Sequence, residues 1–278
     1  MTVRPRRTWL FVPGADPRAH AAAARSGADV LIQELEDFTP PALRAQARAL
    51  APALYKRWRA AGAVVAVRVN PLETCGREDL AAVLPARPDV VLMSKVATPG
   101  QVRALHRATS GKVDLVPNVE SAAGLVRTGE IVRASPRVTA ALLASEDLVA
   151  DLGTARSRGG EELAYARARF LVECRAAGVE AIDCPYTFSD ARGAAADARH
   201  AKRLGYRAKS LVAPAHAKTV NRVFSPQAAE IARARRIVAA FEAARATGRE
   251  RALVGGLLVE VPVYAAAQRL LAGLAPGG

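Results

Sequence analysis

Two carboxylates in the middle of the chain have the type and spacing that most directly suggest chemistry. Glu120 lies near the end of the apolar run Val113–Ser121, and Asp147 ends the run Val138–Asp147 about 25 residues later. Each run is typical of a β-strand and is followed by a helix-like segment. In an alternating β/α chain, the carboxyl ends of neighbouring parallel strands meet at one edge of the sheet or barrel. Two carboxylates repel each other there, and a hard divalent cation such as Mg²⁺ is the usual neutralising partner.

Other apolar runs also end in polar or charged residues. The second ends in Glu36 and Asp37, the third in Arg68 and Asn70, and the fourth in Lys95. A single acid at a strand end is more often a helix cap than a metal ligand. Several acids facing a guanidinium and an ammonium are different, because burying uncompensated charges costs several kcal/mol each. The pattern predicts a metal-and-carboxylate site for an anionic small molecule. The remaining charged residues near strand ends are Glu34, Glu146, Asp183 and Lys209.

The elements that must position these residues alternate along the chain. Apolar runs recur with Ala- and Arg-rich stretches of helical spacing between them, which favours parallel strands joined by right-handed crossovers. Eight such units predict a closed (β/α)₈ barrel, a TIM barrel, over residues 1–222. Asp183 is expected to be structural, fixing the turn at Pro185. The expected strands are Thr8–Gly14, Val30–Asp37, Val64–Asn70, Val90–Val96, Val113–Ser121, Val138–Asp147, Ala181–Thr187 and Ala208–Ala215.

Residues 223–278 are not needed to close a barrel and form a predicted C-terminal helical extension. A long helix is expected to run to Arg245, with Ser225 as its N-cap and Pro226 in its first turn. An apolar strand from Leu253 and a last helix then follow. Because the barrel can close without this tail, we expect the tail to contact a neighbouring subunit.

Composition narrows the possible partners. The net charge is +14, but the Arg residues are dispersed and aromatic residues make up only 5%, so nucleic acid is not expected. No apolar run reaches the 18 residues of a membrane span, and the first residues show no signal-peptide core, so a cytoplasmic location is expected. The three cysteines show no metal-ligand spacing and are expected to be reduced thiols.

Short motifs resemble one family. The string Arg7-Thr-Trp-Leu-Phe-Val-Pro-Gly14 resembles the opening of the citrate lyase β-subunit and malyl-CoA lyase group, within the HpcH/HpaI aldolase and citrate lyase superfamily. Further matching motifs, in the same order along residues 7 to about 265, are Leu35-Glu-Asp37, Arg68-Val-Asn70, Val119-Glu-Ser121, Glu146-Asp-Leu-Val-Ala-Asp-Leu-Gly153 and Val223-Phe-Ser-Pro226.

The resemblance implies a (β/α)₈ barrel with Mg²⁺ held by Glu120 and Asp147. It implies that Arg68 grips an oxo or carboxylate oxygen of the substrate, and that Glu36 and Asp37 hold metal-bound waters. Members of the group assemble as trimers or hexamers. In several, a C-terminal acid reaches a neighbouring subunit's site for proton transfer.

Three positions depart from the family pattern. The C-terminal acid is Glu260, where the family commonly has Asp, and the extra methylene changes the reach of a proton-transfer group. Ser94 stands where the family often has Pro. The step Val212-Ala-Pro214 stands where Ile-His-Pro is frequent, which removes a polar contact near the site.

The expected function is a Mg²⁺-dependent carbon–carbon lyase acting on a 3-hydroxyacyl-CoA of the malyl-, citramalyl- or citryl-CoA type. Cleavage leaves an enolate, so a divalent cation and Arg68 would stabilise the developing charge, with Asn70 and Lys95 as further substrate contacts. One alternative is a class II aldolase that releases pyruvate or a related 2-oxoacid without CoA. Another is a subunit of the same fold that has lost turnover. Mn²⁺ in place of Mg²⁺, and trimer against hexamer, stay open.

Overall fold

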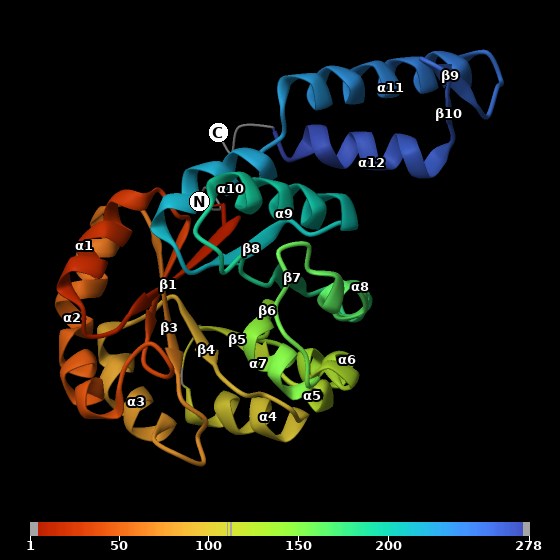
Figure 1. The fold of residues 1–278 in the computed structure, drawn as a ribbon. Coiled ribbons are helices and arrows are strands. Elements are labelled where there is room, and N and C mark those ends of the chain that lie inside the picture. The colour runs from red at the N-terminus through yellow and green to blue at the C-terminus, as the bar shows by residue number, and fades with distance from the viewer. Residues whose placement is uncertain (1–4, 110, 112, 275–278) are drawn as a thin grey trace. The chain divides into compact units, whose positions relative to one another are not determined.

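The chain folds around a closed barrel of eight parallel strands with helices outside it (Figure 1). The computed structural model describes residues 5–109, 111 and 113–274. Each strand pairs in parallel with the next, and β8 pairs with β1, so the (β/α)₈ barrel is confirmed. The strands are β1 (Thr8–Pro13), β2 (Val30–Glu34), β3 (Val64–Val69), β4 (Val90–Met93), β5 (Asp114–Val119), β6 (Ala140–Leu143), β7 (Glu180–Asp183) and β8 (Ala208–Leu211).

The strands alternate with helices, and several strands end earlier than expected; β2 ends at Glu34, so Glu36 and Asp37 lie in the turn that follows it. A short helix, α3, follows β3, and two short helices, α5 and α6, lie between β5 and β6. The sixth strand is shorter than expected, so Asp147 lies in α7. The helices are α1 (Pro17–Ser26), α2 (Arg44–Ala60), α3 (Gly76–Val83), α4 (Pro99–Ala108), α5 (Ala122–Val126), α6 (Thr128–Arg133), α7 (Ser145–Asp151), α8 (Ala164–Ala176), α9 (Ala191–Leu204) and α10 (Ala217–Phe224), with short 3₁₀ turns at Pro41–Leu43, Leu84–Ala86, Glu161–Leu163 and Pro214–His216.

Apolar side chains of the strands form two layers. Alternate residues point into the barrel, where Trp9, Phe11, Ile32 and Leu142 belong to one buried cluster. Their neighbours point outward against the helices, as Leu10 does within the larger cluster. This is the side-chain alternation of a β-strand, with both faces buried. It decides which residue at each strand end faces the interior.

Charged residues are also buried in the outer layer. Asp183 of β7 lies 2.7 Å from an Arg167 guanidinium nitrogen and 2.6 Å from Lys209 Nζ, and Asp197 of α9 pairs with both cations. Two acids thereby neutralise two bases between the barrel and α8 and α9. Asp183 is therefore structural, because its carboxylate is paired with both of these cations. Lys209 belongs to this cluster and not to the barrel interior.

A second compact unit begins at Ser225. It contains α11 (Ala228–Ala246), the hairpin of β9 (Ala252–Val254) and β10 (Leu257–Val259), and α12 (Val261–Ala272). The N-cap of α11 is Gln227, which forms a capping box with Glu230, so the prediction of Ser225 as the cap was wrong. The expected strand from Leu253 is a hairpin because Gly255 and Gly256 both have positive φ, as a two-residue turn requires. Among the helices that the structure describes, none is long and apolar enough to cross a membrane.

Candidate metal and substrate site

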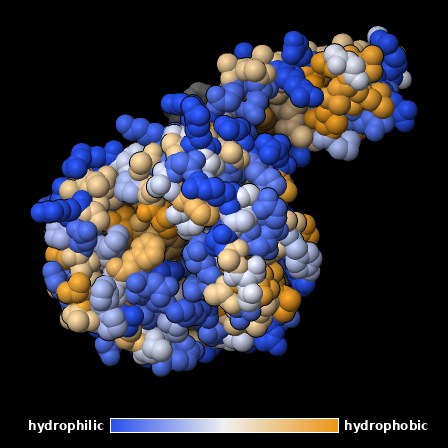
Figure 2. Space-filling model, in the orientation of Figure 1, coloured by the Kyte–Doolittle hydropathy of each residue, from blue (hydrophilic) through white to orange (hydrophobic). Residues whose placement is uncertain are grey.

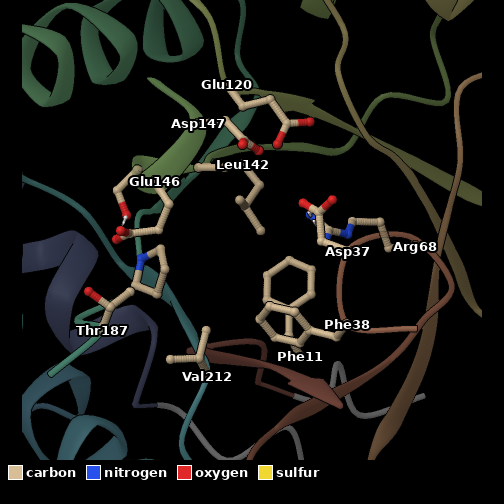
Figure 3. A pocket seen from close by; sticks show the side chains of 13 residues that line it. Phe11, Asp37, Phe38, Arg68, Glu120, Leu142, Glu146, Asp147, Thr187 and Val212 are labelled. Atoms are coloured by element: carbon tan, nitrogen blue, oxygen red, sulfur yellow. Dashed lines mark hydrogen bonds and ion pairs between the residues drawn. The ribbon is translucent and has the colours of Figure 1, made fainter. Parts of the chain in front are cut away.

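The carboxyl ends of the strands bring several predicted residues to one pocket (Figure 3). β2 leads into the turn with Asp37 and Phe38, and β3 supplies Arg68. Glu120 directly follows β5, and Asp147 lies in the first turn of α7, just after β6. The pocket has a volume of about 260 Å³.

Glu120 and Asp147 form an acidic pair. Glu120 is 3% exposed, and one of its oxygens accepts a hydrogen bond from the backbone N–H of Lys95. Its other oxygen, Oε2, is buried without a hydrogen-bond donor in the described part of the chain. Burial raises the pKa of Glu120 to about 8; the neighbouring Asp147 carboxylate adds to the shift, while Arg68 opposes it. Without a cation, this pair therefore holds a proton near neutral pH.

Arg68 is the buried cation of the site. Its Nε lies 2.8 Å from Glu34 Oε1, and a terminal nitrogen lies 3.0 Å from Glu36 Oε2. The guanidinium carbon is 4.9 Å from the centre of the Phe11 ring, at a cation–π distance. These contacts fix the guanidinium at the pocket wall. Burial by itself would lower the pKa of Arg68, but the Glu34 and Glu36 carboxylates keep this pKa raised.

Lys95 and Glu36 form a second charged pair beside Arg68. Lys95 Nζ lies 2.5 Å from Glu36 Oε1 and 3.7 Å from an Asp37 oxygen. The hydrogen bond with Glu36 is the main reason that the pKa of Lys95 is raised. Lys95 also has a φ of 54°, a left-handed conformation that is uncommon outside glycine and costs free energy. This conformation lets its backbone N–H donate to Glu120 while its side chain reaches Glu36.

The acidic pair fits a hard divalent cation. Two carboxylates meet with a buried oxygen that lacks a donor, and Mg²⁺ commonly uses one or two protein carboxylates with water or substrate oxygens. Within the described ranges, no cluster of three or more His, Cys, Asp or Glu is arranged to hold a metal. A cation bound here would thus have Glu120 and Asp147 as its protein ligands.

Three residues predicted from the sequence either lie outside this pocket or have side chains that are already paired within the protein. The Asn70 amide donates to Leu35 O and to Asp79 Oδ2, each at 2.8 Å, so both of its N–H groups are used within the protein. Glu146 lines the pocket, but its carboxylate pairs with Arg156 at 3.1 Å. Glu260 belongs to the second unit, at the N-terminus of α12, where it pairs with Arg251 at 3.0 Å and is half exposed.

Glu34 is a polar residue at this site whose role the sequence reasoning did not identify. It is fully buried and pairs with Arg68 across the register of β2 and β3. The available signal was its two-residue spacing from Ile32, which puts both side chains on one face of β2; the structure shows that this face is the barrel interior. An apolar wall was also missed: Phe11, Phe38 and Leu142 line the pocket opposite or beside the acids (Figure 3).

A closed parallel barrel with buried acids and a guanidinium at its strand ends defines an enzyme of the (β/α)₈-barrel class. The chain matches the HpcH/HpaI aldolase/citrate lyase family over residues 7–214. It belongs to this family.

Curated relatives and solved structures extend over most of the chain. The citrate lyase subunit beta of Leuconostoc mesenteroides subsp. cremoris is 33% identical, covering 96% of this chain and 93% of the relative. A (3S)-malyl-CoA thioesterase of Cereibacter sphaeroides is 34% identical, covering 92% and 90%. The structure of CitE from Mycobacterium tuberculosis in complex with magnesium, acetoacetate and coenzyme A is 28% identical, covers 97% of this chain and 98% of that chain, and has a TM-score of 0.81.

Proposed function

We propose that this protein is a Mg²⁺-dependent carbon–carbon lyase that cleaves a 3-hydroxyacyl-CoA. The observation that carries the proposal is the buried pair of Glu120 and Asp147 beside the Arg68 guanidinium. Family membership supports the same reaction class, and a related structure contains magnesium and coenzyme A.

The residues have separate roles in this proposal. Glu120 and Asp147 would hold the cation, which when bound supplies Lewis-acid stabilisation of the oxygen that becomes a carbonyl. Arg68 adds a fixed positive charge at the same oxygen or at the adjacent carboxylate. Glu36 and Asp37, held by Lys95, would position water at the site. Mn²⁺ would satisfy the same oxygen ligands.

The overall reaction is balanced within the substrate. The hydroxyl proton passes to the water that Glu36 and Asp37 would position, the C2–C3 bond breaks, and C3 becomes the carbonyl of a 2-oxoacid. The electron pair stays on C2 as a thioester enolate, which must then take up a proton. We propose Glu260 of a neighbouring subunit as the group that transfers this proton. Its carboxylate is half exposed in the C-terminal unit, so it is accessible to a partner.

Besides its hydroxyl and carboxylate, C3 of the substrate carries one further substituent, and the pocket favours a substrate in which this substituent is uncharged. Pro185 and Val212 extend the apolar wall of Phe11, Phe38 and Leu142. Among the described residues that line the pocket, Arg68 is the one basic side chain. Its guanidinium is already paired with Glu34 and Glu36. The second free carboxylate of citryl-CoA, placed against this wall, would lose its hydration without a cation, at a cost of several kcal/mol. We therefore favour substrates of the malyl- and citramalyl-CoA type over citryl-CoA.

Assays of the purified protein with Mg²⁺ test the proposal. Malyl-CoA, citramalyl-CoA and citryl-CoA are supplied in turn, and acetyl-CoA, 2-oxoacid and free thiol are measured. Acetyl-CoA and 2-oxoacid in equal amounts indicate the lyase. Because one relative is a malyl-CoA thioesterase, free CoA with intact malate is a specific second outcome, and it would contradict the lyase.

The class II aldolase alternative is tested in parallel. Cleavage of a 4-hydroxy-2-oxoacid, with no cleavage of any CoA ester, would favour that alternative. Free CoA should also raise the melting temperature, because a ligand that binds only the folded state stabilises it by mass action. Persistent inactivity toward both substrate types, with Mg²⁺ still bound, would indicate a subunit that has lost turnover.

We further propose a homotrimer or hexamer assembled through the C-terminal unit. Leu253 and Leu258 face each other across β9 and β10 and are 72% and 49% exposed. Figure 2 shows apolar residues gathered at this end of the C-terminal unit, a surface that a partner would cover. Light scattering measures the assembly, and a monomer at micromolar concentration would contradict it. Mixing inactive Glu260→Gln and Asp147→Asn proteins should restore activity only if the two residues act across subunits. The three cysteines are free, which agrees with the proposed cytoplasmic location.

A further inference from the structure

One fully buried carboxylate lies behind the pocket wall and has three N–H donors. Glu34 Oε1 accepts from Arg68 Nε at 2.8 Å and from the backbone N–H of Glu36 at 2.6 Å. Its Oε2 accepts from the backbone N–H of Phe38 at 2.5 Å. The side chain has no exposed surface and does not line the pocket. It cannot meet the substrate itself.

Each of the three donors belongs to a part of the site. Arg68 is the buried cation at the pocket wall. The other two donors are in the turn after β2, which carries Asp37 and Phe38 to the pocket and places Glu36 against Lys95. The same turn is closed by the Thr39 hydroxyl, which donates to the backbone oxygen of Glu34 at 2.5 Å. One carboxylate therefore joins a β3 side chain to the β2 turn.

A purely structural buried ion pair has different surroundings, and this chain contains one. Asp183 and Arg167 form a pair that is just as buried, at 2.7 Å, on the outer face of the barrel. Their other side-chain partners are Lys209, Asp197 and the Cys184 thiol, and these do not line the described pocket. The Glu34 pair differs because it contains Arg68, which lines the pocket, and because its other N–H donors lie in the turn that carries Asp37 and Phe38 to the pocket.

We propose that Glu34 is a positioning residue for the lyase reaction. It acts through Arg68 and through the turn at residues 36–38, holding both in one arrangement before the substrate binds. A preorganised guanidinium and turn need little rearrangement when the 2-oxoacid part of the substrate enters. The inference rests on the proposed function for the choice of ligand.

Glu34→Gln separates this role from packing, because glutamine has nearly the same shape. Glutamine has one acceptor oxygen, and its NH₂ group faces one of the three N–H donors. At least one donor then loses its partner, and the buried Arg68 loses its full counter-charge. The guanidinium and the turn can no longer both keep their places.

The experiment measures pyruvate binding in the presence of Mg²⁺ by titration calorimetry. We expect Glu34→Gln to weaken the Kd by about tenfold or more, as misplacing a binding group does. The matched control is Asp183→Asn, which breaks the outer buried pair. It should lower the melting temperature at least as much and leave the Kd within about twofold of wild type. Equal pyruvate binding by Glu34→Gln and wild type would overturn the inference.

A measurement on wild type keeps the inference testable if Glu34→Gln does not fold. In wild type, the backbone amides of Glu36 and Phe38 should exchange hydrogen slowly, because they donate to a buried carboxylate. Exchange as fast as in an exposed loop would overturn the inference. Where Glu34→Gln folds, it should weaken pyruvate binding less in an Arg68→Met background than in wild type, because only the turn is then left to be displaced. An undiminished tenfold loss in that background would overturn the part of the inference that acts through Arg68.

A failure of the proposed function gives a different result. Wild-type protein that binds no pyruvate with Mg²⁺ would contradict the proposed site, and hydrogen exchange at the turn would then decide the Glu34 inference by itself.

Discussion

Replacing Asp147 with asparagine should have opposite effects on the metal-free and the Mg²⁺-loaded protein. In the metal-free protein the pKa of Glu120 is raised to about 8, mainly by burial and further by Asp147. At about 1.4 kcal/mol for each pKa unit, ionising Glu120 at high pH costs on the order of 5 kcal/mol. Burial persists in Asp147→Asn, but the repulsion disappears and the new amide can donate to the orphan Oε2.

A hydrogen bond to a charged group contributes about 1.5–3 kcal/mol, so the metal-free variant should be more stable by about 1–2 kcal/mol. For a chain of this length, that corresponds to a melting temperature higher by about 2–4 °C for each kcal/mol. Wild type should gain about 2.7 kcal/mol from Mg²⁺ at one hundred times its Kd, and the variant should gain almost nothing. The order of stability therefore reverses when Mg²⁺ is added.

Scanning calorimetry near pH 9, in chelator and then in excess Mg²⁺, measures both effects. Glu146→Gln is the matched control, because Glu146 precedes Asp147 in α7 but pairs with Arg156. The control should keep the wild-type response to Mg²⁺. An Asp147→Asn protein that gains as much stability from Mg²⁺ as wild type would refute the assignment of Asp147 as a ligand. A variant that is less stable than wild type in chelator would refute the repulsion argument.

Three other results are expected. Metal-free protein should lose stability as the pH rises from about 5 to 9, because the folded pKa of Glu120 lies above its unfolded value and the stabilising proton is lost through about pH 8; a melting temperature that is flat over this range in chelator would contradict this. Arg68→Met should lower kcat/KM by about a hundredfold or more, since it removes a fixed charge from the site and leaves Glu34 buried without its cation; steady-state kinetics on folded protein measures this, and a loss below about threefold would count against the role. Asp183→Asn should lower the free energy of unfolding by about 3–5 kcal/mol in a denaturant titration while activity per folded molecule is kept, and an unchanged midpoint would show that the outer cluster stabilises nothing.

The order of strands and helices follows from local features of the chain. Apolar runs with helical stretches between them leave parallel pairing as the arrangement that buries both faces of each strand. Because parallel strands end at the same rim, residues after the strands must gather there, which is why Glu120, Asp147 and Arg68 could be placed together. The second unit was less predictable. Ser225 and Gln227 are both near the start of α11, and the sequence did not show that Gln227 is the residue that caps it.

Residue type and position along the chain thus determined the barrel and the presence of acids and Arg68 at its rim. Tertiary structure alone decided which way each side chain faces. Both faces of these strands are apolar, so no polar alternation marks the inner one, and Lys209 points outward while Glu34 points inward. It also decided which polar groups are already hydrogen-bonded within the protein, as the side-chain amide of Asn70 is to Asp79. Such pairings join residues from different strands and helices, and no spacing within one segment contains them.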